Sequence, residues 1–132
     1  MLSYNNPSAA NYHVNNKSAI CVDLIAANGT GPIDLASAEY PATFTIDGPP
    51  LFGYSTVSIE ITTNGAATGT FAVHQSNSGQ KPVGSVASAT GTLPGSGSVF
   101  VEIPVFTSKY ALIEFAGATA GNIRQIIVVA KQ

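Results

Sequence analysis

The sequence predicts a single all-β domain, a jelly roll or antiparallel β-sandwich, preceded by an extended N-terminal arm. Three observations support this prediction. Short runs of β-branched and aromatic residues recur along the chain, turn residues such as Gly and Pro separate them, and no segment has the spacing of an amphipathic helix. The chain has 132 residues, of which 45% are hydrophobic. It is therefore long enough to bury one core without disulfides or metals.

The N-terminal segment differs from the rest in composition. Residues 1–17 are polar, rich in Asn and without periodicity, so we expect an arm, with the sandwich domain over residues 18–132. Two interpretations of the arm stay open: a frayed terminus, or a strap across a neighbouring subunit. The side chains that such a strap can bury on a partner are Tyr4, Pro7, Tyr12 and Val14.

Two strands are predicted before residue 50. Residues 18–26 are mainly apolar, and the turn residues Asn-Gly-Thr-Gly-Pro at 28–32 end this candidate strand. Residues 33–39 have room for one short turn of helix. Residues 40–46 are β-branched and aromatic, and the Asp-Gly-Pro-Pro sequence at 47–50 is expected to stop the second strand.

A hairpin is predicted next. Residues 55–62 alternate between apolar and polar side chains, which indicates a half-buried strand. Residues 70–75 are expected to pair with them across the loop that contains Asn64 and Gly65. His74 lies on the polar face of this strand.

The second half of the chain holds a long loop and three strands. Residues 76–97 are rich in Gly, Ser, Ala and Pro, with a short possible strand near 83–86. They are too many for a simple turn, so we expect a functional or interface loop. Residues 99–103 alternate until Pro104, which cannot donate to a strand ladder. Strands at 109–115 and 123–130 are partly apolar on both faces, as expected for strands covered on two sides. The candidate contacts in the long loop are Lys81 and Pro82. The side chains expected to be mostly buried are Val57, Ile59, Ile61, Phe71, Val73, Val99, Val101, Ile103, Leu112, Ile126 and Val128.

Charged residues are scarce. Seven Asp or Glu and five Lys or Arg make up 9% of the chain, against about 25% in an ordinary domain. A free monomer normally keeps itself in solution with mixed charge. We therefore expect much of this surface to lie against other protein, with a homotrimer as the predicted state. The shortage of acids, bases and metal ligands favours a structural part over an enzyme.

The same composition argues against several partners. The net charge is −2 and the five basic residues are scattered, so nucleic-acid binding is not expected. The longest apolar run, residues 126–130, is far shorter than the roughly 20 residues of a membrane-spanning helix. Residues 1–17 lack the basic and apolar regions of a signal peptide. We expect neither a membrane partner nor secretion.

Patterns for catalysis or metal binding are weak. Cys21 lies in an apolar stretch and is expected to be a buried structural thiol. His13 and His74 are isolated, so no metal or other cofactor is expected. Glu60 and Glu102 are expected on solvated strand faces rather than as a glycosidase pair.

The C-terminal third has an order of elements that a known family shares. Residues 97–132 read GSVFVEIPVFTSKYALIEFAGATAGNIRQIIVVAKQ: a strand that ends in Ile-Pro, a short link, an aliphatic strand opened by Lys-Tyr, a Gly-rich turn and a last β-branched strand. The upstream segments SAICVDLIAANGTGPIDL and STVSIEITTNGAATGTFAVHQSNS fit the same family's N-terminal stretch and hairpin. The chain thus resembles the small jelly-roll capsid cement proteins of tailed phages, typified by that of a Bordetella phage.

This resemblance implies a capsid decoration protein. Proteins of that family are trimeric clamps on the outside of an icosahedral shell and have no active site. The implied partners are the major capsid protein and further copies of the chain. The implied location is the exterior of the virion, after synthesis in the host cytoplasm. The Asn-rich arm of residues 1–17 departs from the family's pattern.

A binding module, such as a phage fibre tip or a carbohydrate-binding sandwich, stays open as the alternative. Sugar-binding surfaces usually present exposed aromatic rings. The chain has no Trp, and the aromatic residues near its central loops are Tyr40, Phe52 and Tyr54.

Overall fold

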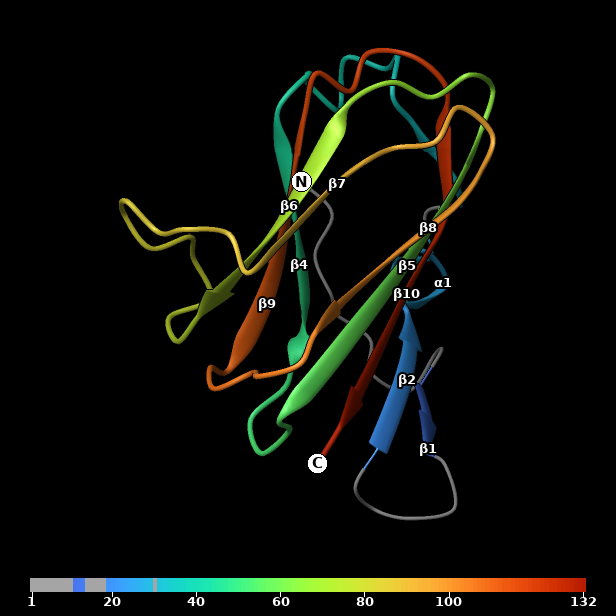
Figure 1. The fold of residues 1–132 in the computed structure, drawn as a ribbon. Coiled ribbons are helices and arrows are strands. Elements are labelled where there is room, and N and C mark those ends of the chain that lie inside the picture. The colour runs from blue at the N-terminus through green and yellow to red at the C-terminus, as the bar shows by residue number, and fades with distance from the viewer. Residues whose placement is uncertain (1–10, 14–18, 30) are drawn as a thin grey trace.

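Two antiparallel sheets pack face to face in the computed structural model, which describes residues 11–13, 19–29 and 31–132 (Figure 1). The larger sheet runs in the order β1 (Asn11–His13), β2 (Ala19–Asp23), β10 (Asn122–Lys131), β5 (Thr56–Asn64) and β8 (Gly97–Ile103), and β3 (Ile33–Asp34) pairs with β10. The smaller sheet runs in the order β4 (Phe44–Pro50), β9 (Tyr110–Ala116), β6 (Thr70–Ser76) and β7 (Ala89–Thr92). We call them the β10 sheet and the β9 sheet.

The strand pairs are nested one inside the other. β6 pairs with β7, β5 with β8, β4 with β9, and β2 with β10, all antiparallel. The chain therefore behaves as one long hairpin that is rolled up, so that successive pairs alternate between the two sheets. This is the connectivity of a jelly roll. The predicted all-β sandwich is confirmed.

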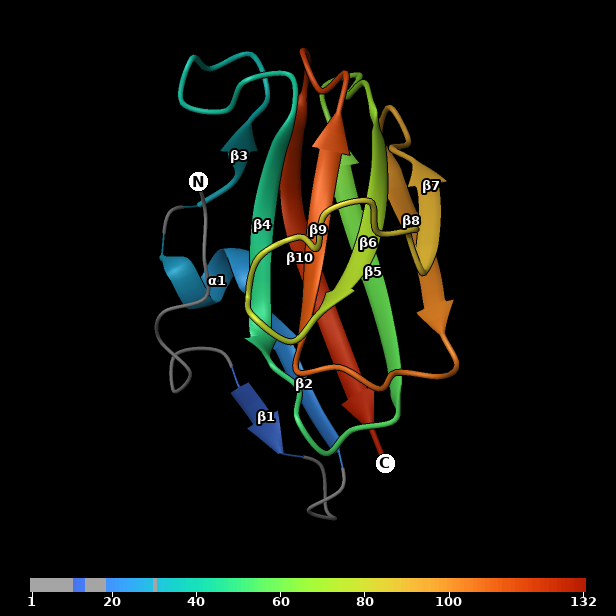
Figure 2. The ribbon, with the colours of Figure 1, turned by 90° about the vertical axis from the view of Figure 1, so that its left-hand side faces the viewer.

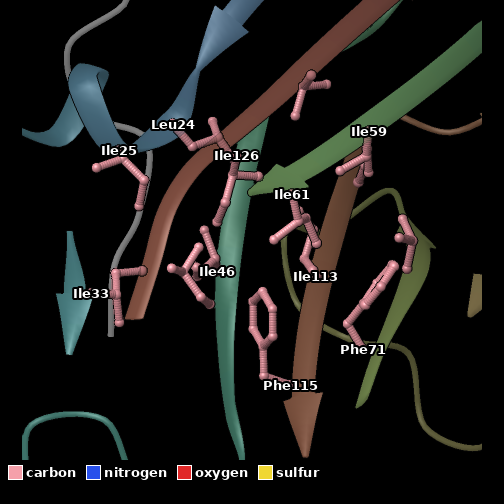
Figure 3. Close-up of a cluster of buried hydrophobic side chains, with 14 of the residues drawn as sticks. Leu24, Ile25, Ile33, Ile46, Ile59, Ile61, Phe71, Ile113, Phe115 and Ile126 are labelled. Atoms are coloured by element: carbon pink, nitrogen blue, oxygen red, sulfur yellow. The ribbon is translucent and has the colours of Figure 1, made fainter. Parts of the chain in front are cut away.

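The apolar side chains of both sheets meet between them (Figure 3). On β5 the predicted alternation is confirmed, because Val57, Ile59 and Ile61 are buried and Glu60 is exposed. Further side chains in this core come from both sheets and from the segment after β2. Figure 3 labels Leu24, Ile25, Ile33, Ile46, Ile59, Ile61, Phe71, Ile113, Phe115 and Ile126.

Two of the predicted core residues are less buried than expected. Val99 and Val101 face the core from β8 but are only partly buried. The reason is their place in the sheet: among the described residues, β8 is an edge strand that pairs with β5 alone. Ile103, at the end of the same strand, is buried.

The predicted hairpin between residues 55–62 and 70–75 is wrong. β5 belongs to the β10 sheet and β6 to the β9 sheet, so the chain crosses from one layer to the other after Asn64. A turn signal such as Asn-Gly marks the end of a strand but does not say whether the next strand pairs with it. Here β5 pairs with β10 and β8, whereas β6 pairs with β9 and β7.

A short helix replaces the end of the first predicted strand. β2 stops at Asp23, and α1 covers Leu24–Asn28. The Asp23 carboxylate caps this helix by accepting the backbone N–H of Ile25 at 3.0 Å, and Gly29 ends it with a left-handed φ of 67°. The helical turn expected within residues 33–39 is not present, since these residues form β3 followed by turns.

The second predicted strand is displaced toward the C-terminus. β4 begins at Phe44 and continues through Asp47 to Pro50, although the Asp-Gly-Pro-Pro sequence was expected to stop it. β4 is an edge strand, where proline removes no needed hydrogen bond. The pairing with β9 shifts register between Asp47 and Pro50.

Candidate interaction surface

The segment between β6 and β7 forms a loop on the outer face of the β9 sheet. It leaves the end of β6, passes in front of β9 and β4, and returns to β7 (Figure 2). We call residues 77–88 the covering loop. The sequence predicted a long interface loop with a short strand near residues 83–86. The strand is wrong, because a turn at Val83 and Gly84 stands in its place.

The first half of the covering loop folds around one buried hydroxyl. Ser76, the last residue of β6, is 2% exposed. Its Oγ donates to the carbonyl oxygen of Gln80 at 2.6 Å and accepts the backbone N–H groups of Ser78 and Gly79 at 3.2 and 3.1 Å. A buried polar group is stable only when it is hydrogen-bonded, and this one satisfies three backbone groups at once.

The second half of the covering loop is bound to β6. Ser85 Oγ lies 2.8 Å from Nδ1 of His74. The Gln75 side-chain amide donates to Ser88 Oγ at 2.9 Å. The backbone N–H of Ser88 donates to the carbonyl of Val73 at 2.8 Å. These three contacts fix the return of the chain to β7.

An ion pair holds the middle of the loop against the sheet. Lys81 Nζ lies 3.2 Å from a carboxylate oxygen of Glu114 on β9, and the two side chains are partly exposed. Exposed pairs of this kind stabilise a fold only slightly, typically by about 0–1 kcal/mol. Together with the hydrogen bonds of Ser76 and Ser85, however, the pair gives the loop a third point of attachment.

The covering loop lies over a row of side chains on the outer face of the β9 sheet, two of which are buried and one partly buried. Asp47 on β4, Leu112 on β9 and His74 on β6 are register neighbours across the sheet. Leu112 is 1% exposed although it is not part of the core between the sheets, and His74 is 4% exposed. The sequence placed His74 on a polar face; it does point away from the core, but the loop covers it. The strands at 109–115 and 123–130 were both predicted to be covered on two sides. This is confirmed at Leu112 of β9, whereas the outer-face residues Ile127 and Val129 of β10 are only partly buried.

The surroundings of Asp47 change the pKa of its carboxyl group. Asp47 lines a hollow beside the loop together with Gln80 and Lys81. Burial raises the pKa of the Asp47 carboxyl above its ordinary value. The covering loop therefore lies beside a partly buried carboxyl group whose charged form is disfavoured by burial.

Two valines stand at the outer side of the loop. Val83 and Val86 have relative exposures of 105% and 89%. The predicted contact residues Lys81 and Pro82 precede them and are exposed as well. Sequence reasoning missed the valines because it assigned them to a strand. The available signal was two large aliphatic residues inside a segment otherwise rich in Gly, Ser, Ala and Pro.

Other large apolar side chains are exposed elsewhere. Phe100 lies on the outer face of β8 and Val105 on the link to β9. Phe52 follows β4, is 78% exposed, and has Lys109 Nζ 6.0 Å from its ring centroid. These residues come from separate parts of the fold, unlike the two valines of the covering loop.

The aromatic candidates for sugar binding do not gather on one surface. Tyr40 is buried with its ring tilted against that of Phe44, whereas Tyr54 is partly buried against the core. Phe52 alone of the three is well exposed. An open polar hollow of about 580 Å³ lies beside α1, where Arg124, Gln125 and Asp23 line it without an aromatic ring.

The described part of the chain holds no group of three or more His, Cys, Asp or Glu residues placed to bind a metal. Glu60 and Glu102 are both exposed and not directly opposite, since Glu60 pairs with Phe100. Cys21 lies on the outer face of β2 and is partly exposed, not buried as expected. Burial and the charge of Asp23 raise the pKa of the Cys21 thiol, which opposes its ionisation.

The predicted arm contacts can be placed only in part. Tyr4, Pro7 and Val14 lie outside the described residues. Tyr12 belongs to β1, whose backbone pairs with β2 at the edge of the β10 sheet. Within residues 11–13, 19–29 and 31–132, the structure has no helix of the length and apolarity that crossing a membrane takes.

Neither a protein-family model nor a curated protein sequence matches the chain.

Proposed function

We propose that this protein is a structural virion protein, a decoration or cement protein that binds the outside of a phage capsid. The observation that carries the proposal is a jelly-roll sandwich with only 9% charged residues. The resemblance of residues 97–132 to capsid cement proteins supports it. Its partners are the major capsid protein and further copies of itself as a homotrimer, without cofactor, nucleic acid or membrane.

The mechanism is adhesive rather than catalytic. Uncharged hydrogen-bonding groups and small apolar patches bridge neighbouring shell subunits and stabilise their contacts. Each such contact is weak, but copies linked in a trimer act at high effective concentration on the particle. Because few charges take part, the attachment depends little on ionic strength, in contrast to contacts between exposed charges.

Co-sedimentation with emptied capsids tests this function. The capsids are assembled from the major capsid protein encoded with this chain, and the purified protein is added at increasing concentration. We expect saturable binding in many copies per particle, with an affinity that changes less than about threefold between low and high salt. Absence of binding contradicts the proposal, and a steep loss of binding with salt contradicts the adhesive mechanism.

A fibre-tip or carbohydrate-binding module is the alternative. The exposure of the Phe52 ring is the observation that favours it. A glycan array and the copy number on particles separate the two functions. A cement protein is present in many copies and gives no glycan signal, whereas a fibre tip is present in few copies and binds a defined sugar that the Phe52→Ala variant no longer recognises.

A further inference from the structure

We propose that β8 pairs with β8 of a second copy of this chain, antiparallel about a two-fold axis, so that the β10 sheet continues from one molecule into the next. Pairing of two identical edges is complete with two copies, so this contact is separate from the three-fold contact of the predicted homotrimer. It joins chains of different trimers. The inference rests on the edge of the sheet and does not depend on the capsid function.

β8 has an open hydrogen-bonding edge. Among the described residues, its seven residues pair with β5 alone, and the register runs through all of them without a shift. The backbone N–H and C=O groups of a strand alternate between its two sides, so those that point away from β5 meet no other strand there. Among protein partners, an extended strand is what matches such a row of donors and acceptors.

The two edges of the β9 sheet differ from β8 in this respect. β7 has only four residues, and β4 ends in Pro49 and Pro50 with a shift in its register against β9. Short edges, prolines and irregular register are the features that keep edge strands from pairing with another chain. β8 is longer than β7, contains no proline and has one charged residue, Glu102. The fold therefore leaves this edge open to a further strand.

The sequence of β8 fits a second copy of itself. Val99, Phe100 and Val101 read the same in both directions. An antiparallel pair centred on Phe100 therefore places Val99 opposite Val101 of the other copy, and the two Phe100 rings opposite each other on the outer face. The two valines are only partly buried, and Phe100 is 60% exposed. The second copy covers the side of these residues that its own chain leaves open.

The charge of β8 favours the antiparallel arrangement. With Phe100 at the centre, Glu102 lies opposite Ser98 of the other copy, whereas a parallel pair in the same register would bring the two Glu102 carboxylates together. β7, on the same side of the sandwich in Figure 2, has the uncharged sequence ATGT and does not repel a second copy. One strand pair is small beside the about 1,600 Å² of a standard stable interface, so the contact is weak and has to be trapped.

Disulfide trapping of the purified full-length chain tests the pairing. All chains carry Cys21→Ser, and one preparation carries Ser98→Cys while the other carries Glu102→Cys, both at exposed positions of β8. Opposite residues of an antiparallel pair have Cα atoms about 4.5–5.5 Å apart, which a disulfide spans. Two copies of the same position would instead be four residues apart along the strand, about 13 Å. Thermal unfolding midpoints verify that each variant keeps the fold.

On mild oxidation we expect the mixture of Ser98→Cys and Glu102→Cys chains to form at least about fivefold more linked dimer than either preparation alone. Phe100→Lys, added to both chains, sets two lysines opposite each other and should remove this excess, because like charges repel across a strand pair. The proposal is overturned if the mixture links no better than Phe52→Cys, an exposed site away from β8. Equal linking by one preparation alone, or linking that persists with Phe100→Lys, overturns it as well.

Discussion

Ile59 on β5 and Val101 on β8 are register partners, and their burial differs with the position of their strands in the sheet. Ile59 is 1% exposed and has neighbouring strands on both sides, whereas its register partner Val101 is only partly buried on an edge strand. Both were expected in the core from the alternation of their strands. The pattern identifies the inward face correctly, but it does not identify the edge of a sheet.

Truncation of these two residues should have unequal effects. We expect Ile59→Ala to lower the free energy of unfolding by about 2–4 kcal/mol, because it removes buried methyl groups and leaves a cavity. Val101→Ala should cost less, about 1 kcal/mol, because part of that side chain is already in water. Urea titrations of both variants measure the difference. Equal costs would contradict the edge position of β8.

The ionised carboxyl of Asp47 lowers the stability of the folded state, unlike a carboxylate in a favourable ion pair. Burial raises its folded pKa above the unfolded value of about 4. The folded state therefore binds the proton more readily than the unfolded state, and this group lowers stability as the pH rises through the two pKa values. Its cost is fully present at neutral pH and absent in strong acid.

We predict that Asp47→Asn stabilises the protein at pH 7 and has little effect at about pH 3. Urea midpoints at the two pH values measure this difference. Glu102→Gln is the matched control, because Glu102 is exposed on β8 and its replacement should leave both midpoints almost unchanged. Destabilisation by Asp47→Asn at pH 7 would show that the carboxylate makes a favourable contact that outweighs its burial.

At the scale of the elements, the connection into β10 depends on a close backbone approach. Gly121 has a φ of 82°, and a Cβ atom there would lie 2.4 Å from Ala67 Cα. Gly84, in the turn of the covering loop, has a similar φ of 72° but no atom within 4 Å of the same position. The two glycines thus share the left-handed conformation and differ in the space around them.

Alanine substitutions at Gly84 and Gly121 distinguish the cost of a left-handed backbone from the cost of a steric clash. Gly84→Ala should lower the free energy of unfolding by about 1–2 kcal/mol, the cost of a left-handed alanine. Gly121→Ala should cost several kcal/mol more than that, because the backbone of Ala67 has to move. Chemical denaturation of both variants gives the comparison. Similar values would mean that the turn at Gly121 rearranges freely.

The elements that the sequence predicted well are those with a strong local pattern. The alternation of β5 and the apolar run of β10 indicated strands at nearly the observed bounds. The helix α1 was missed because a single capped turn is too short to show a period. β4 was misplaced because Pro49 and Pro50 end a central strand but are tolerated on an edge.

The sequence predicted the long loop after β6, but not the residues that hold it against the β9 sheet. Composition alone indicated that the loop after β6 is too long for a turn. Which residues brace it depends on contacts with other elements, such as Ser85 with His74 and Lys81 with Glu114, and no local pattern contains these pairs. Residues 83–86 were misread because the φ of Gly84, which turns the chain, is not a property of the flanking valines.

For the molecule as a whole, the scarcity of charge is the feature that points beyond a monomer. We expect the purified protein to sediment as a homotrimer, since closed symmetric association is the usual way to cover an uncharged surface. Analytical ultracentrifugation at several concentrations measures this state. A species of 13.5 kDa at all concentrations, together with capsid-bound copies unrelated by a three-fold axis, would contradict the trimer.

The place of β10 has a consequence for how the chain is made. β10 lies in the β10 sheet between β2 and β5, yet every other strand of the sandwich is synthesised before it. Until β10 pairs, β2 and β5 lack the neighbour that joins them within the β10 sheet. Pairing of β2 with β10 also closes a loop that spans most of the chain, and such long-range contacts form slowly. The β10 sheet is therefore joined only when segments more than 100 residues apart in the chain come together.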